Sequence, residues 1–319
     1  MKRLILVVLI LGAGAYFGAK FLMHYRVGEA VDDMLIMASP FVDIQYQGVS
    51  SSFDGRLSID GVTIRMHEFR EPVYIDRISV ITPGFLFLIS MGDTEKFVRD
   101  FEIPETFGFA FESLQVSTNA DYFRELRERG KAEIEASDAQ DVAAVCTGKY
   151  GFEPSTLEAL GYTDLDISMS MAYRQTEQNL FLDITADIKD MYAFDITLTF
   201  ADPLTPASLV GGNYRPRMAE GRLEYLDLSL KERTARLCAE QGLSDEEILT
   251  AQIDALQASG LENGLEFDEY VLDPYREFLE GKSTFILTAK PNEPISLTQI
   301  DLYKPEDVPA LLNLTGEVY

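Results

Sequence analysis

The sequence predicts an α+β protein in which an N-terminal transmembrane helix precedes antiparallel β-meander sheets with packed helices. Three observations predict this class: an early apolar run, strand-like alternation through the middle of the chain, and helix-start signals toward the C-terminus. The 319 residues allow two domains or one large β-rich domain. We expect an anchor at 1–26, a β-rich region at 27–135, and an α+β region at 136–319 that holds the meander and C-terminal helices.

The predicted anchor begins with the basic pair Lys2 and Arg3. Sixteen uncharged, mostly apolar residues follow, and Lys20 then interrupts the run. At about 1.5 Å per residue, residues 4–23 span about 30 Å, the hydrocarbon thickness of a bilayer, if Lys20 extends its ammonium to the headgroups. A cleaved signal peptide would be unusually short, and a buried core helix does not suit the basic pair in front. We therefore expect an uncleaved signal anchor, with cleavage as the alternative.

The charges beside the anchor predict its orientation. Lys2 and Arg3 lie on one side and Lys20 with Arg26 on the other, so the positive-inside count is almost tied. No second hydrophobic span follows, and we therefore place the N-terminus in the cytoplasm. The predicted localisation is a single-pass protein of the bacterial inner membrane with a periplasmic body.

The net charge excludes one class of partner. The chain has 27 Lys and Arg residues against 53 Asp and Glu residues, a formal net charge of −26. Nucleic-acid binding depends on clustered basic side chains, so we expect no nucleic-acid partner.

Strand-like alternation begins after the anchor region. Residues 41–47 alternate, as do the segments on either side of Asp60-Gly61, which predicts a hairpin at that dipeptide. Residues 73–82 and 107–118 add two more expected strands.

The clearest pattern lies between residues 164 and 200. Three consecutive segments alternate apolar with polar residues and have short connections, which predicts an antiparallel meander with one apolar and one wet face. Residues 219–230 are expected to add a fourth strand.

Helix signals follow the meander. We expect helices over 231–241, from a capping box at Ser244-Asp245-Glu246-Glu247, and from Asp273-Pro274. A strand at 283–290 and a short helix near 305–313 complete the chain. Residues 196–209 and 285–297 share a strand that ends in a two-proline stretch, which suggests a possible internal duplication.

One early segment carries a resemblance. Gly55-Arg56-Leu57-Ser58-Ile59-Asp60-Gly61-Val62, behind an N-terminal span, resembles the AsmA-like and YdgA-like envelope proteins of Gram-negative bacteria. The resemblance covers mainly residues 1–82. It implies a β-rich body that handles envelope lipids, although this chain is short and its C-terminal half is interrupted by helices.

Cys146 and Cys238 are the chain's two cysteines. An even count in an exported protein favours a disulfide between them. The alternative is a pair of small buried thiols, because free cysteine is among the most buried residue types.

Few residues suggest catalysis. The chain has two histidines, His24 and His67, and no zinc or phosphate-loop motif, so we expect no catalytic residue, cofactor or metal. A hydrolase stays an alternative prediction, because four carboxylates lie on the expected polar face: Asp164, Asp166, Asp183 and Asp187. Their spacing does not match a calcium loop.

The predicted function is therefore binding rather than catalysis. We expect a non-enzymatic, membrane-anchored binding or scaffold protein whose partner is a membrane lipid or another envelope protein. A carboxylate-dependent envelope hydrolase and a passive membrane-tethered spacer are the alternatives. The sequence leaves open whether helices seal the apolar sheet face or leave part of it accessible.

Overall fold

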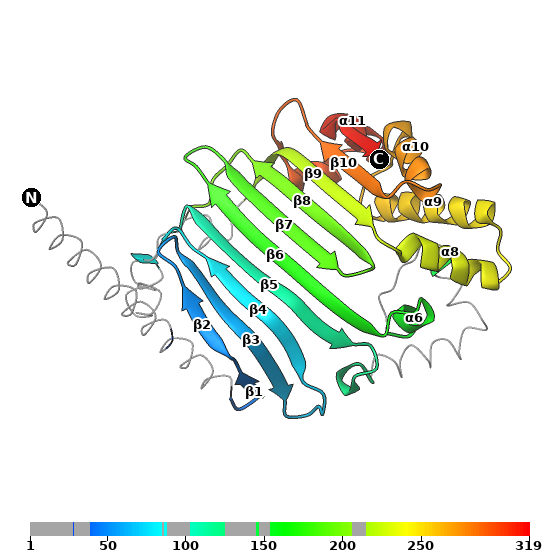
Figure 1. The fold of residues 1–319 in the computed structure, drawn as a ribbon. Coiled ribbons are helices and arrows are strands. Elements are labelled where there is room, and N and C mark those ends of the chain that lie inside the picture. The colour runs from blue at the N-terminus through cyan, green and yellow to red at the C-terminus, as the bar shows by residue number, and fades with distance from the viewer. Residues whose placement is uncertain are drawn as a thin grey trace, which may run out of the picture. The chain divides into compact units, whose positions relative to one another are not determined.

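The structure is a computed structural model that describes residues 28, 39–84, 86–87, 103–124, 145–146, 154–205 and 215–319. These residues contain twelve strands, β1 to β12. Strands β1 to β10 are labelled in Figure 1. The chain divides into two compact units, residues 1–113 and 114–319. Strand β5 (Thr106–Ser117) runs from the first unit into the second. The domain boundary predicted at 135/136 lies outside the described residues.

The predicted α+β class with a transmembrane helix is wrong. Antiparallel strands dominate the described residues, and the helices are few. The longest of these helices, α9 (Asp245–Glu262), has 18 residues and three acidic residues in its first turn. No helix in the described part of the chain combines enough length and apolar character to cross a bilayer. The predicted transmembrane anchor, and with it the single-pass inner-membrane localisation with a periplasmic body, has no such helix among the described residues. Residues 1–26, with Lys2, Arg3 and Lys20, lie outside the described residues.

In the first unit, the long strand β3 (Arg56–Met66) pairs antiparallel with three shorter strands. Its first half pairs with β2 (Gly48–Ser51) and its second half with β1 (Val42–Gln45). Strand β4 (Val73–Ile81) pairs along almost the whole length of β3. The hairpin predicted at Asp60-Gly61 is wrong, because both residues lie within β3.

Gly61 marks the place where the partner of β3 changes. Its φ is +61°, and a side chain here would collide with the side chain of Gln47 in the β1–β2 connection. The Gln47 N–H donates to the Asp60 carbonyl at 2.9 Å. The Asp60 carboxylate accepts a hydrogen bond from Arg77 Nε on β4 at 2.7 Å. The Asp-Gly dipeptide therefore forms an irregularity within one strand, which has the same sequence signature as a tight turn.

The second unit contains an antiparallel sheet in the order β6-β7-β8-β9-β10-β12. Its strands are β6 (Asp164–Gln175), β7 (Leu180–Ile188), β8 (Tyr192–Phe200), β9 (Arg217–Asp227), β10 (Thr284–Ala289) and β12 (Leu314–Val318). The short strand β11 (Ile295–Ser296) pairs with the start of β9. The predicted meander is confirmed, because β6, β7, β8 and β9 pair in chain order.

The helices of the second unit lie near the strand ends and beside β9 and β10 (Figure 1). They are α6 (Pro154–Ala159), α8 (Leu230–Glu240), α9, α10 (Glu269–Leu279) and α11 (Val308–Leu312). Short 3₁₀ segments occur at Asp121–Phe123, Leu297–Leu302 and Pro305–Asp307. The capping box predicted between Ser244 and Glu247 is confirmed.

Helix α10 starts earlier than the sequence predicted. Asp268 caps its N-terminus by accepting a hydrogen bond from the Tyr270 N–H, and Pro274 lies inside the helix. Proline at this position cannot donate to the Tyr270 carbonyl. That carbonyl and the Pro274 ring approach Gly316 of β12 so closely that a side chain at Gly316 would be in tight contact with both. Glycine in β12 therefore permits α10 to lie directly against the sheet.

Candidate functional site

The register of the second-unit sheet arranges its apolar side chains in rows that cross the strands. Residues directly opposite one another lie on the same face, and every second residue along a strand returns to that face. One row contains Tyr173, Leu182 and Leu198, and the next contains Met171, Ile184, Ile196 and Leu223. The rows therefore form one continuous apolar face on β6, β7, β8 and β9.

The C-terminal cluster covers one end of this face. Its core consists of buried side chains from β7 to β9, α10, β10, α11 and β12: Leu180, Phe200, Met218, Val271, Phe278, Phe285, Val308, Leu312 and Leu314. Tyr173, Leu182 and Leu198 pack against it. The row that these three form is therefore covered.

A second cluster, here called the α6–α8 cluster, covers the other end. Its buried members are Val145, Leu157, Leu160, Tyr162, Met191 and Leu230. Leu165, Ile188 and Tyr192 of the sheet pack against it. Tyr162 is held in place from two sides, because its hydroxyl and Ser229 Oγ are 2.8 Å apart and the Arg233 guanidinium lies 4.0 Å from its ring centroid.

Two rows between these clusters have seven apolar members that belong to neither cluster in the described part of the chain, although one row ends at Tyr225, which packs against the C-terminal cluster. We call this set the central strip, and its members are Met169, Met171, Ile184, Ala186, Phe194, Ile196 and Leu223. Met171 is 45% exposed. The other six are half-buried. The central strip is therefore a partly exposed apolar surface with buried clusters on both sides.

Aromatic rings border the central strip toward β9 and α10. The Tyr192 ring stacks on Phe194 with a centroid distance of 6.4 Å and on Tyr225 with a centroid distance of 5.5 Å. Tyr225 meets Phe278 edge-on at 5.7 Å. This series connects the strip to the C-terminal cluster through rigid side chains.

A lysine fastens α10 beside these rings. Lys231 Nζ donates to the Phe278 carbonyl and to the Lys282 carbonyl, and it lies 3.8 Å from the Phe278 ring centroid. Burial lowers the pKa of the Lys231 ammonium, while nearby Asp227 opposes this shift. Burial also raises the pKa of the Asp227 carboxyl. The pair holds the C-terminal end of α10 against the start of α8.

The four carboxylates proposed for a hydrolase lie on β6 and β7. The register places Asp183 opposite Ala172 and Asp187 opposite Ser168, on the face opposite the central strip. Asp183 and Asp187 are four residues apart on one strand, about 13 Å. Asp164, Asp183 and Asp187 are exposed, and Asp166 is half-buried. Within the described ranges, no group of His, Cys, Asp and Glu residues could hold a metal ion.

The two cysteines form a disulfide in the structure. Cys146 and Cys238 lie 92 residues apart in the chain, with their Cα atoms 5.6 Å apart. Both are fully buried, with Ile248 of α9 in the same cluster and Leu243 packed against it. The bond ties residue 146 to α8.

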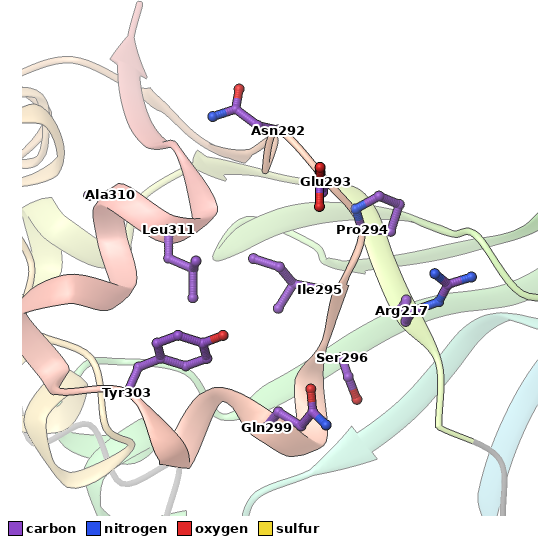
Figure 2. Close-up of a pocket in the computed structure, with 10 residues that line it drawn as sticks. All are labelled: Arg217, Asn292, Glu293, Pro294, Ile295, Ser296, Gln299, Tyr303, Ala310 and Leu311. Atoms are coloured by element: carbon purple, nitrogen blue, oxygen red, sulfur yellow. The ribbon is translucent and has the colours of Figure 1, made fainter.

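Sequence reasoning missed a pocket near the C-terminus (Figure 2). The pocket has a volume of about 480 Å³ and lies among β9, the β10–β11 connection, β11, the 3₁₀ segment 297–302 and α11. The sequence signal there was the proline pair Pro291 and Pro294, which we interpreted only as part of a possible repeat. The accessibility of the central strip was left open by the sequence, since alternation alone does not show which helices cover a face.

The fold and the strip define a mostly β protein with a partly exposed apolar sheet surface. A protein-family model described as "Uncharacterized protein" matches residues 165–318, which covers β6 to β12. No curated protein matches the chain. The AsmA-like resemblance concerned residues 1–82, outside the matched range, and it stays a prediction.

Proposed function

We propose that this protein is a binding protein whose central strip takes up the acyl chain of a lipid. The observation that carries the proposal is the set of seven apolar side chains, on two adjacent rows, that neither buried cluster includes among the described residues. Contiguous apolar surface of this kind indicates an interaction site. The lipid handling implied by the AsmA-like resemblance agrees with this proposal in kind.

The composition of the strip supports an acyl chain as the ligand. Met169 and Met171 are flexible, polarizable side chains that adapt to a mobile chain. Phe194 and the aliphatic side chains beside it contribute apolar surface without hydrogen-bonding groups. The strip therefore favours contact with methylene groups, and it has no hydrogen-bonding side chain to orient a polar ligand.

The dimensions of the strip set the scale of the affinity. Four strands about 4.8 Å apart and two rows about 7 Å apart give a surface of about 14 Å by 7 Å. If about ten methylene groups were fully buried at about 0.8 kcal/mol each, the gain would be about 8 kcal/mol, equivalent to a Kd near 1 μM. We therefore expect micromolar or weaker binding.

The experiment is a titration of the full chain with a fluorescent polyene fatty acid. The strip variant is Met169→Gln/Met171→Gln, which keeps the side-chain length and introduces amides that lose hydrogen bonds to water when a chain covers them. The matched control is Ala172→Gln, the next residue of β6, which lies on the opposite face.

We expect saturable binding that weakens about 10-fold or more in the strip variant and changes less than about 2-fold in the control. Absence of saturable binding at about 100 μM fatty acid would overturn the proposal. Equal loss in the two variants would place the ligand elsewhere. Capture of a defined protein without fatty-acid binding would favour the scaffold alternative instead.

A further inference from the structure

The C-terminal pocket is a second concave site, made of residues that the acyl-chain proposal does not use. Its volume of about 480 Å³ falls in the range of small-molecule sites. Its walls come from four chain segments of the second unit: the start of β9, the β10–β11 loop with β11, the 297–303 stretch, and α11.

The centre of the pocket is apolar and contains an aromatic ring. Figure 2 shows the Tyr303 ring, the Leu311 side chain and the Ile295 side chain pointing toward one another. Tyr303 is 46% exposed, whereas Ile295 and Leu311 are half-buried. An exposed tyrosine ring offers an apolar face together with a hydroxyl that can donate and accept.

The rim of the pocket is polar. Asn292 and Glu293 lie on one side, and Ser296 and Gln299 lie on another (Figure 2). Two amides, a carboxylate and a hydroxyl supply both donors and acceptors in planar or freely rotating groups. A ligand with many hydroxyl groups can satisfy such a rim.

The charge of the pocket favours a neutral ligand. Its one cationic lining residue, Arg217, donates from Nε and Nη2 to the Asp202 carboxylate at 2.9 and 2.8 Å. This bidentate pair lowers the pKa of the Asp202 carboxyl and neutralises the guanidinium charge within the protein. A strongly anionic ligand would have to compete with Asp202.

We propose that this pocket binds a neutral saccharide, with the apolar face of the sugar ring on Tyr303 and its hydroxyl groups toward Asn292, Glu293 and Gln299. The Leu311 and Ile295 side chains exclude water from the buried side of the sugar ring. The proposal concerns a different site from the central strip, so either can fail without the other.

The test is an amide NMR titration of the full chain with methyl β-glucoside and with N-acetylglucosamine. We expect saturable shifts at residues 292–303 and 310–311, with a Kd of about 1–10 mM, as is ordinary for a single sugar ring that makes few contacts. Tyr303→Ala removes the ring platform and should weaken binding about 10-fold or more.

Tyr270→Ala is the matched control, because Tyr270 is a 65% exposed tyrosine on α10 that does not line the pocket. It should change the affinity less than about 2-fold. Neither substitution removes a buried side chain, so both variants should fold. Absence of saturable shifts up to about 50 mM of both sugars, shifts outside the pocket, or equal loss in the two variants would overturn the proposal.

Discussion

The C-terminal cluster and the central strip lie on the same face of one sheet, yet they differ in burial. Leu180 and Phe200 are 6% and 7% exposed, whereas Met171, two rows away on the same face, is 45% exposed. The residue types and the period-2 alternation are the same in both regions. The difference comes from α10 and α11, which pack over one end of the face.

Which side chains share a face of a sheet is determined locally, whereas which of them are covered is not. Alternation along a strand determines which side chains share a face, because successive side chains point in opposite directions. Whether a side chain is covered depends on segments far away in the chain. Val271 and Phe278 of α10 belong to the same buried cluster as Leu180, although they lie 91 and 98 residues after it. An apolar row without such a cover is available to a ligand.

The largest loss in the free energy of unfolding is expected for a substitution at Phe278. This 4% exposed side chain joins α10 to Phe285 and Tyr225, so Phe278→Ala should leave a cavity in the C-terminal cluster. We expect a loss of about 3–5 kcal/mol in the free energy of unfolding, measured by urea denaturation. A loss below about 1 kcal/mol would mean that the cluster does not hold α10 to the sheet.

The disulfide between Cys146 and Cys238 tests the stability of the opposite end of the face. Cys146→Ala/Cys238→Ala removes a covalent link between two fully buried residues that lie 92 residues apart in the chain. We expect a loss of about 2–4 kcal/mol in unfolding free energy, measured by the same denaturation. Unchanged stability in the double variant, with the wild-type disulfide shown by mass spectrometry, would contradict this account.

Tyr275 gives a pH-dependent test of the covered end. Burial raises its pKa to about 12, since the neutral phenol is favoured beside Phe278 and Phe285. The folded-state pKa lies above the unfolded value of 10, so this stabilisation is present below pH 10 and is lost as the pH rises from about 10 to 12. Wild type should lose about 2 kcal/mol more than Tyr275→Phe over that range, measured by denaturation at pH 9 and 11.5. Parallel pH profiles would show that the Tyr275 hydroxyl titrates as if exposed.

The smallest effect is expected in the central strip. Phe194 is half-buried and belongs to neither cluster, although its ring stacks on Tyr192. Phe194→Ala should therefore lower the unfolding free energy by about 1 kcal/mol or less, far below the loss at Phe278. A loss comparable to that of Phe278→Ala would mean that the strip is part of the core.

The sequence predicted the strands of the meander, since alternation over 164–200 is long and regular. It failed at Asp60-Gly61, where a positive-φ glycine inside a strand has the signature of a turn. It also failed at Pro274, which lies inside α10, where its ring is close to Gly316 of β12. The predicted fold class was wrong because the helix signals indicated that helices are present but did not indicate the proportion of helix to sheet. The pocket around Tyr303 could not be predicted, because four separate segments build it.

Photocrosslinking would show whether the central strip contacts an acyl chain. A fatty acid with a photoreactive group near the end of its chain would be irradiated with the full-length protein, and the labelled peptides identified by mass spectrometry. We expect labels on residues 169–171, 184–186 and 194–196, and we expect unlabelled fatty acid to reduce them by competition. Labels confined to the opposite face of β6 to β8, or to residues far from the sheet, would contradict the proposal.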